Sequence, residues 1–343
     1  MRQRTKLVLV VAVLLSIHAV VLLAGFFAPY DVEAQHRDLP FAPPMRVRFV
    51  DSNGNPHLRP FVYPWSAREG GFGEYAEDRN HPAELRFLVQ GKPYTIVGLF
   101  TLRVRLFGAE NGARVFLMGT DGFGRDLFSR VIYGGQISLL AGLLATAISL
   151  LLGLVLGGIA GYYGSWVDDV LMRGTELFLA LPWLYLLLAI RAFLPLQVNP
   201  SQAFLLLIVV IGAIGWARPA RLLRGVVLSA RERDFVRAAR GFGASDFYLL
   251  RRHVLPQTFG VLLTQAAILV PQYILAEVTL SFLGLGVGEP VPSWGSMLGS
   301  LQQYHVLSSY WWMFLPGLAL VPYLLGYSAL AAILHERVKD VFL

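Results

Sequence analysis

The sequence predicts an α-helical polytopic membrane protein with six transmembrane helices and a small β-rich extracytoplasmic insertion between helices 1 and 2. Hydrophobic residues make up 55% of the 343 residues, and the mean hydropathy of +0.56 exceeds that of an ordinary soluble domain. Apolar runs of about 20 residues, long enough to cross a ~30 Å hydrocarbon layer, recur along the chain. Arginines cluster between some of these runs, which is typical of cytoplasmic loops.

Composition also excludes several classes of function. The net charge of +7 comes from arginines beside apolar runs, which favours a topology signal over nucleic-acid binding. The absence of cysteine excludes disulfides, thiol catalysis and thiolate metal sites, and the 7 histidines are scattered rather than clustered. No Gly-x-x-x-x-Gly-Lys-Ser/Thr phosphate loop is present, so ATP hydrolysis by such a loop is not expected on this chain. We therefore predict no catalytic residues, no metal site, no cofactor on this chain and no nucleic-acid partner.

The first predicted domain, residues 1–28, is a transmembrane helix. Met1–Lys6 is basic, and Leu7–Phe27 is almost uninterrupted apolar sequence. The alternative is a signal peptide, but its apolar core is only about 7–15 residues long and a small-residue cleavage site is not evident here. Basic residues before the apolar run predict a cytoplasmic N-terminus.

The second predicted domain, residues 29–118, is an extracytoplasmic β-rich subdomain. Turns are predicted at Asn53-Gly54 and at Gly91–Pro93, each between two strands of a hairpin. The predicted strands have alternating or β-branched and aromatic sequences: Met45–Val50, Phe61–Tyr63, Glu84–Gln90, Tyr94–Phe100 and Leu102–Leu106. Arginines within this subdomain do not contradict the topology, because long translocated loops escape the positive-inside rule.

The third predicted domain, residues 119–343, contains the other five transmembrane helices. The second span, about Ser138–Tyr162, has small residues at intervals of three and four that allow close helix packing, namely Gly153, Gly157, Gly158 and Gly161. A short inner loop is expected at Gly164–Arg173. The third span is Thr175–Leu194, which Pro182 is expected to kink and in which Glu176 can pair with Arg173.

The fourth span, Ala203–Trp216, is short and needs one more turn at each end. We accept it because the arginine-rich segment that follows would otherwise lie outside, against the positive-inside rule. The fifth span is Val261–Leu285. Its Glu277 and Gln272 are candidates for a position along a pathway or for hydrogen bonds between helices, and both interpretations stay open. The loop Gly286–Tyr310 returns outside, Trp311–Leu334 is the sixth span, and His335–Leu343 is an inner tail.

An arginine-rich segment, residues 229–257, separates the fourth and fifth spans. Asp234–Arg240 predicts a short helix that Gly241 and Gly243 interrupt. Ser245 can cap a second helix with Asp246 in its first turn, and Pro256 is expected to close the segment. Charge alone is equally compatible with binding to anionic lipid, but it does not explain this ordered layout.

The glycine-rich run at the start of the third domain predicts the turn and helix that lead into the second span. Thr120-Asp121 can start a turn, and Asp126–Tyr133 can form an amphipathic helix along the membrane surface. We expect its paired charges to hold the start of the span at the interface, in preference to a direct role with substrate. The residues of this interface motif are Gly119, Thr120, Asp121, Gly124, Arg125, Asp126, Ser129 and Arg130.

Three stretches together resemble the permeases of the oligopeptide/dipeptide (and nickel) branch of ABC importers. The first is the interface motif, and the second is the run AEVTLSFLGLG around Glu277. The third is the segment 229–257, which resembles the family's Glu-Ala-Ala-x-x-x-Gly…Leu-Pro loop through Ala238, Ala239, Gly243, Leu255 and Pro256. The chain departs from that pattern at Arg237, where the family usually has Glu, so that any contact made through this carboxylate is in question. Asp234 or Glu232 are candidates to replace it.

The resemblance implies a six-helix, type I importer permease in the inner membrane, with both termini in the cytoplasm. It also implies that residues 229–257 are a coupling loop that docks on an ATPase subunit, with a docking helix over Ser245–Leu250. The residues of this loop that we assign to docking are Ala238, Ala239, Gly243, Ala244, Ser245, Asp246, Leu250, Leu255 and Pro256.

The partners implied are a second homologous permease, two ATPase subunits that hold ATP and Mg, an extracytoplasmic substrate-binding protein and membrane lipid. Peptides are the substrate that the resemblance favours, with nickel chelates and short oligosaccharides still open. The β-rich subdomain could dock the binding protein or cap the pathway. An ion-gradient-driven secondary transporter and a membrane-anchored scaffold remain as alternatives. The scaffold would need neither Glu277 nor the ordered inner loop, and no internal symmetry supports the secondary transporter.

Overall fold

The computed structural model describes residues 2–67, 74–96, 100–109, 113–193 and 199–342. The chain has two compact units, each built from segments that are distant in sequence. Unit 1 comprises Met1–Leu14, Leu139–Leu280 and Pro322–Leu343, and unit 2 comprises Leu15–Ser138 and Ser281–Val321. The two units are defined by contacts between residues and not by position along the chain. The domain boundaries at residues 28 and 118, which we expect from composition, therefore stay a prediction.

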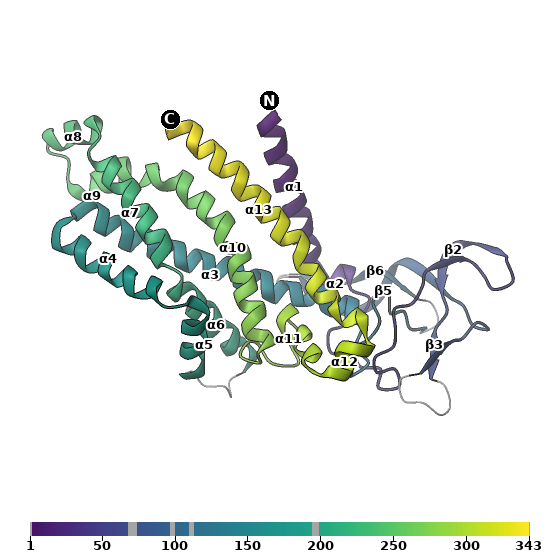
Figure 1. Cartoon of the computed structure of the whole chain (residues 1–343). Coiled ribbons are helices and arrows are strands. Elements are labelled where there is room, and N and C mark those ends of the chain that lie inside the picture. The colour runs from purple at the N-terminus through teal and green to yellow at the C-terminus, as the bar shows by residue number, and fades with distance from the viewer. Residues whose placement is uncertain (1, 68–73, 97–99, 110–112, 194–198, 343) are drawn as a thin grey trace. The chain divides into compact units, whose positions relative to one another are not determined.

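Four helices are long and apolar enough to cross a membrane, within the part of the chain that the structure describes. They belong to α1 (Arg2–Leu22), to α3 (Leu127–Tyr163), to the continuous helical stretch Asp246–Phe282 that ends in α10 (Phe259–Phe282), and to α13 (Leu315–Phe342), whose first turn continues from a 3₁₀ turn at Trp311–Phe314. Two bent helix pairs would raise the number to six if each pair is one span. The protein is thus a helical membrane protein with four to six candidate spans (Figure 1).

The first bent pair joins α4 (Ser165–Ala180) to α5 (Trp183–Phe193) at an angle of 91°. The break falls at Leu181-Pro182, where Pro182 has no N–H to continue the helix and restricts the residue before it. The expected kink is therefore present, and it is a sharp one. The expected inner loop Gly164–Arg173 is wrong, because α4 already begins at Ser165 after a turn in which Gly164 has a φ of +66°. The predicted Arg173–Glu176 pair is confirmed, with a distance of 2.9 Å.

The second bent pair joins α6 (Pro200–Ile214) to α7 (Ala217–Arg231) at an angle of 45°. Asn199 caps α6 by accepting a hydrogen bond from the Gln202 N–H at 2.9 Å. The predicted fourth span covers α6 alone, and the basic helix α7 extends it at its C-terminal end. If this pair is one span, the arginine-rich helix α7 supplies the length that the predicted span lacks.

Close packing of α3 against α7 confirms the interpretation of the small residues in the second span. A Cβ atom on Gly157 would lie 2.3 Å from the Ala220 carbonyl oxygen, and one on Gly161 would lie 2.7 Å from the Arg224 carbonyl oxygen. Such distances leave no room for a methyl group, so these two glycines set the separation of the helices. In the first turn of α4, the Asp168 carboxylate accepts two hydrogen bonds from the Arg224 guanidinium of α7.

Unit 2 contains the strands, which all lie between Arg48 and Ala109 among the described residues. One antiparallel sheet has the order β1-β2-β5-β6, and β3 and β4 form a second, two-stranded sheet. The strands are β1 (Arg48–Val50), β2 (Pro56–Val62), β3 (Trp65–Ala67), β4 (Tyr75–Glu77), β5 (Ala83–Ile96) and β6 (Phe100–Ala109). The first predicted hairpin corresponds to β1 and β2, with Gly54 at a φ of +87° in the turn.

The second predicted hairpin is wrong in its position. β5 passes through Gly91–Pro93 as one strand and pairs with β6, so that Gln90 faces Val104 and Tyr94 faces Leu102. The register shift between Gln90 and Tyr94 leaves Pro93, which lacks an N–H, in a bulge where the ladder needs no donor from it. Residues 97–99 of the predicted strand Tyr94–Phe100 lie outside the described residues.

Unit 2 also contains short helical elements that come before and after the strands in the sequence. They are α2 (Ala24–Phe27), α11 (Trp294–Leu298), a 3₁₀ turn at Gly299–Gln302 and α12 (Tyr304–Ser309). The Trp294 indole N–H donates to the Val131 carbonyl at 2.8 Å, and the Trp312 indole N–H donates to the Thr120 carbonyl at 3.2 Å. These two bonds hold the chain after α10 against the interface motif.

Candidate functional sites

The interface motif forms a tight, buried turn in unit 2. Gly119 and Gly124 have φ angles of +78° and +70°, and a Cβ on Gly124 would lie 1.9 Å from the His36 carbonyl oxygen. Glycine is therefore required at Gly124 by backbone conformation and by space. The Thr120 hydroxyl donates to the Leu39 carbonyl at 2.6 Å and accepts from the Ala42 N–H at 2.8 Å. The turn is thereby fixed to the chain that follows α2.

Asp126 and Ser129 start the helix α3. The Asp126 carboxylate accepts hydrogen bonds from the Ser129 N–H at 2.8 Å and from its hydroxyl at 2.6 Å, which is the geometry of a helix N-cap. Burial raises the pKa of Asp126 to about 7. The expected amphipathic surface helix Asp126–Tyr133 is wrong as a separate element, because these residues are the cap and first turns of a continuous 37-residue helix. The helix continues because the sequence that follows its cap, from Leu127 on, is apolar.

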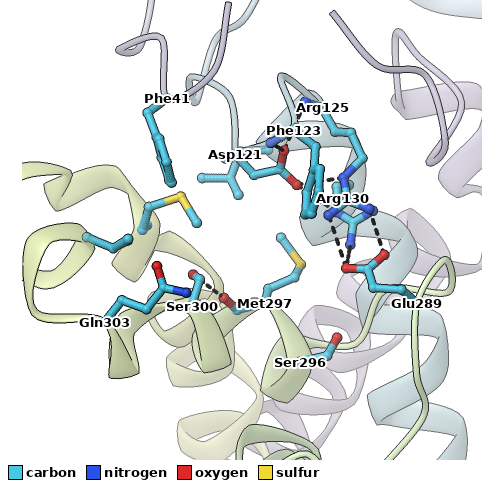
Figure 2. Close-up of a pocket in the computed structure, with 14 residues that line it drawn as sticks. Phe41, Asp121, Phe123, Arg125, Arg130, Glu289, Ser296, Met297, Ser300 and Gln303 are labelled. Carbon is cyan, nitrogen blue, oxygen red and sulfur yellow. Dashed lines mark hydrogen bonds and ion pairs between the residues drawn. The ribbon is translucent and has the colours of Figure 1, made fainter. Parts of the chain in front are cut away.

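Three charged residues of the motif, Asp121, Arg125 and Arg130, form one network with Glu289, whose side chain is half exposed (Figure 2). The Asp121 carboxylate accepts hydrogen bonds from the Arg125 N–H at 3.0 Å and from its guanidinium at 2.7 Å. The Arg125 guanidinium also donates twice to Glu289, at 2.6 and 3.0 Å, and Arg130 donates to the same carboxylate at 3.1 Å. Partial burial alone would raise the pKa of Glu289, but the two guanidiniums hold it below its usual value.

Glu289 is the member of this network that the sequence did not predict. It lies in the loop after α10, and no periodicity or motif distinguishes it from other loop acids. A cavity of about 310 Å³ adjoins the network and is lined by its four charged side chains together with Phe41, Met297 and Gln303 (Figure 2). Two carboxylates face two guanidiniums, so the charges are balanced. The network therefore ties the start of α3 to the loop after α10.

The arginine-rich segment contains one separate short helix, α8 (Asp234–Gly241), between α7 and α9 (Asp246–Leu249) (Figure 1). Gly243 has a φ of +85° in the turn between α8 and α9. Ser245 caps α9, as predicted, and its hydroxyl accepts from the Tyr248 N–H at 3.4 Å. Of the residues expected to dock, Ala238, Gly243, Ser245, Asp246 and Pro256 are exposed. Ala239, Ala244, Leu250 and Leu255 are half-buried.

The predicted docking helix Ser245–Leu250 begins as expected, with Ser245 as its cap, and its docking role stays a prediction. The expectation that it is a separate helix is wrong. α9 continues through a π turn at Leu250–Val254 and a 3₁₀ turn at Leu255–Thr258 into α10, so that Asp246–Phe282 is one helical stretch. Pro256 does not end this helical stretch. The π turn just before it changes the pattern of backbone hydrogen bonds, so that the ring of the proline and its missing N–H do not disrupt the helix. The helix of this segment that does not continue directly into another helix is α8.

Tyr162, at the end of α3, connects the helices α8 and α9. Its hydroxyl donates to the Asp246 carboxylate at 2.6 Å and accepts from the Arg240 guanidinium at 3.0 Å. Below these contacts, Tyr162, Val227, Val236 and Leu249 belong to one buried hydrophobic cluster. The Arg231 guanidinium also donates to the Gly161 and Tyr162 carbonyls, at 3.0 and 2.9 Å. The segment is thus attached to α3 and α7, which the sequence alone did not predict.

Several large aromatic side chains of this segment are exposed. Phe242 is 93% exposed and Phe247 is 72% exposed, on either side of Gly243. Phe235 and Tyr248 are exposed as well. Arg237, which replaces the family's glutamate, is an exposed residue of α8. An exposed apolar group of this kind, surrounded by arginines, is typical of a protein interaction surface.

The two polar candidates of the fifth span lie in different surroundings. Glu277 is fully buried in α10. Gln272 lines a cavity inside unit 1 and so faces accessible space. For Glu277, a place along a pathway and a hydrogen bond between helices both stay open.

Comparison with known proteins identifies the family. The family described as "Binding-protein-dependent transport system inner membrane component" matches residues 153–340, more than half of the chain. The chain therefore belongs to this family of permeases. A dipeptide transport system permease protein, DppC, of Bacillus subtilis (strain 168) is 39% identical over 199 residues, which cover 58% of this chain and 60% of that protein. The chain thus matches less than two thirds of the length of this relative.

A second relative, the dipeptide transport system permease protein DppC of Alkalihalophilus pseudofirmus, is 37% identical over 211 residues. These cover 61% of this chain and 67% of that protein. The resemblance to peptide-transport permeases that the sequence motifs indicated is therefore confirmed.

Proposed function

We propose that this protein is a transmembrane permease subunit of an ATP-driven importer of peptides or similar small solutes. The observation that carries the proposal is the exposed, aromatic and arginine-rich surface of α8 and α9, which Tyr162 connects to the spans. Membership of a binding-protein-dependent transport family and the peptide-transport names of the relatives support it. ATP and Mg are held by partner subunits in this proposal.

The proposed assembly contains this chain, a second homologous permease, two ATPase subunits and an extracytoplasmic binding protein in the inner membrane. The chain crosses the membrane six times, with each bent helix pair counted as one span and both termini in the cytoplasm. The strands between Arg48 and Ala109 form an extracytoplasmic insertion between the first two spans. Closure of the ATPases moves α8, and the motion passes through Tyr162 and α7 to the spans, which open alternately to either side.

The docking surface is tested by co-purification in mild detergent of the tagged chain with its ATPase subunits. Phe242→Ala should reduce recovery of the ATPase at least tenfold, because it removes a 93% exposed ring at the centre of the surface. Phe193→Ala is the matched control, since Phe193 is 90% exposed but lies on α5. Equal recovery with both variants would contradict docking through α8 and α9.

The turn at Gly243 gives a second test, which measures coupling. A Cβ on Gly243 would meet no atom within 4 Å, so only the positive φ of +85° opposes substitution. Gly243→Val should therefore disturb the turn and reduce ATP-driven uptake more than ATP hydrolysis, whereas Gly243→Asn, a residue that tolerates positive φ, should keep both. Unchanged uptake in Gly243→Val would count against the coupling role.

A further inference from the structure

A cavity inside unit 1 lies where several helices are interrupted. It has a volume of about 300 Å³, and its lining residues include Pro182, Trp183, Gly215, Arg218, Gln272 and Tyr273. Pro182 and Trp183 are at the 91° break between α4 and α5, and Gly215 is at the 45° break between α6 and α7. Gln272 and Tyr273 directly follow Pro271 inside α10.

In the proposed topology, the cavity lies at the depth of the membrane interior. The Tyr273 hydroxyl lies 2.9 Å from the Ser149 hydroxyl, and Ser149 is near the middle of the apolar stretch Ser138–Tyr162 of α3. Interrupted backbone at membrane depth is tolerated where it is buried in protein or lines a water-filled space. The breaks at Pro182 and Gly215 meet this condition because both residues line the cavity.

The charge of the cavity is positive. Arg218 lines it, and no aspartate or glutamate does. Among the residues that the structure describes, Arg218 forms no ion pair and no hydrogen bond. The Arg218 side chain is exposed, so its guanidinium is accessible to a charged ligand. Charged residues of membrane spans usually face a partner or a substrate pathway. The first turn of α5, which begins at Trp183, adds N–H groups without helical acceptors and the positive end of its dipole.

The other walls suit an amide and an apolar side chain. The rings of Trp183 and Tyr273 have centroids 6.3 Å apart, and Phe178 also lines the cavity. Gln272 supplies an amide that can both donate and accept. The volume is at the lower end of the range for small-molecule pockets, about 300–1,000 Å³, so it fits one end of a peptide and not a long chain.

We propose that this cavity binds the carboxyl terminus of the transported peptide, with the Arg218 guanidinium as counter-ion to the terminal carboxylate. Gln272 hydrogen-bonds the last peptide amide, and the aromatic walls contact the terminal side chain. This inference rests on the proposed function and goes beyond it, because it assigns part of the selection to this chain.

The first test compares uptake of two peptides by the complete importer, with its binding protein, in liposomes. One peptide has a free carboxyl terminus and the other is the same peptide amidated. Arg218→Gln should reduce uptake of the free form at least tenfold and leave the amide unchanged, and Arg218→Lys should retain most of the uptake. Arg221→Gln is the matched control, because Arg221 is exposed like Arg218 and lies one turn further along α7, but does not line the cavity. An equal fall for both peptides, or no fall, would overturn the proposal.

A second test keeps Arg218 and so does not depend on the folding of that variant. The chain contains no cysteine, so that Leu179→Cys introduces a single thiol at the cavity lining. The peptide with a free carboxyl terminus should slow maleimide labelling of this thiol during ATP-driven turnover at least threefold, and the amidated peptide should not. Leu177→Cys is the control, because Leu177 is 71% exposed on the same helix and does not line the cavity.

The remaining outcomes also decide the matter. Equal protection by both peptides, or none, would overturn the assignment of the carboxylate to this cavity. Protection that appears without peptide in vesicles of anionic lipid, and is absent in phosphatidylcholine vesicles, would identify a lipid as the occupant and overturn it as well. If the native complex imports neither peptide with ATP, the proposed function itself fails, and this inference fails with it.

Discussion

Gly157 sets the distance between α3 and α7, and a single methyl group should show this. Gly157→Ala would place a Cβ 2.3 Å from the Ala220 carbonyl oxygen, so one helix must move. We expect the free energy of unfolding to fall by about 1–3 kcal/mol, the usual cost of overpacking. Gly174→Ala is the matched control in α4, where a Cβ meets no atom within 4 Å and alanine should stabilise the helix slightly. Thermal unfolding in detergent measures both; equal stability of the two variants would contradict this packing.

Asp126 should make the stability of the protein depend on pH. Its pKa is about 7 in the folded protein because it is buried, and about 3.9 in the unfolded chain. Between about pH 4 and pH 7 the folded protein therefore binds more protons than the unfolded chain, and stability falls as the pH rises. Above pH 7 the loss is complete. Asp126→Asn, which can still accept from Ser129, should reduce the fall in melting temperature between pH 5 and pH 8.

The control for this measurement is Asp169→Asn, which changes an exposed carboxylate of α4. It should leave the pH profile of the melting temperature as it is in the native protein. A profile that Asp126→Asn leaves unchanged would contradict the buried, raised state of this carboxyl group.

At the scale of elements, Glu289 ties the loop after α10 to the start of α3. Glu289→Gln removes the charge that Arg125 and Arg130 share, and it leaves two guanidiniums near one carboxylate. We expect a loss of about 1–2 kcal/mol, discounted because the Glu289 side chain is half exposed, and faster hydrogen exchange in the loop Gly286–Ser293. Exchange mass spectrometry measures this loop directly.

Glu176→Gln provides the comparison, because the Arg173–Glu176 pair joins exposed residues of one helix. Such pairs contribute roughly 0–1 kcal/mol, so stability and exchange should hardly change. If the two substitutions had similar effects, the contacts of Glu289 with Arg125 and Arg130 would contribute no more to stability than the exposed Arg173–Glu176 pair.

The elements also show where sequence patterns are sufficient. The Ser245 cap, the break at Pro182 and the close approach of Gly157 were predicted, because each depends on local geometry or on the size of one residue. The position of the second hairpin and the end expected at Pro256 were wrong. In both, a proline that usually interrupts an element is accommodated, by a bulge in β5 and by a π turn before α10.

At the scale of the whole molecule, Tyr162 links the proposed docking surface to the spans. Tyr162→Phe removes the hydroxyl that donates to Asp246 and accepts from Arg240. Hydrogen bonds to charged groups contribute about 1.5–3 kcal/mol, so α8 should lose its fixed position. In the assembled importer, ATP-driven uptake should fall about 3–10-fold, while co-purification of the ATPase remains, because the exposed aromatics are untouched.

Tyr163→Phe is the control for this measurement, since Tyr163 is the next residue of α3 and is 58% exposed. Its uptake should equal that of the native protein. If both variants transport alike, the hydroxyl of Tyr162 does not transmit motion from the docking surface.

The class of membrane protein, the family resemblance, the helix cap and most of the apolar spans could be predicted from the order of the amino acids. These depend on composition, on spacing along the chain and on the identity of single residues such as Gly243 and Pro182. Which distant groups meet could be seen in the folded chain but not predicted. The folded chain joins Glu289 to Arg125 and Arg130, Tyr162 to Asp246, and Arg218 to Gln272 in one cavity. Helical and strand periodicity reports which face of an element is apolar, but it contains no information on which polar residues of separate elements lie within a few ångströms of one another.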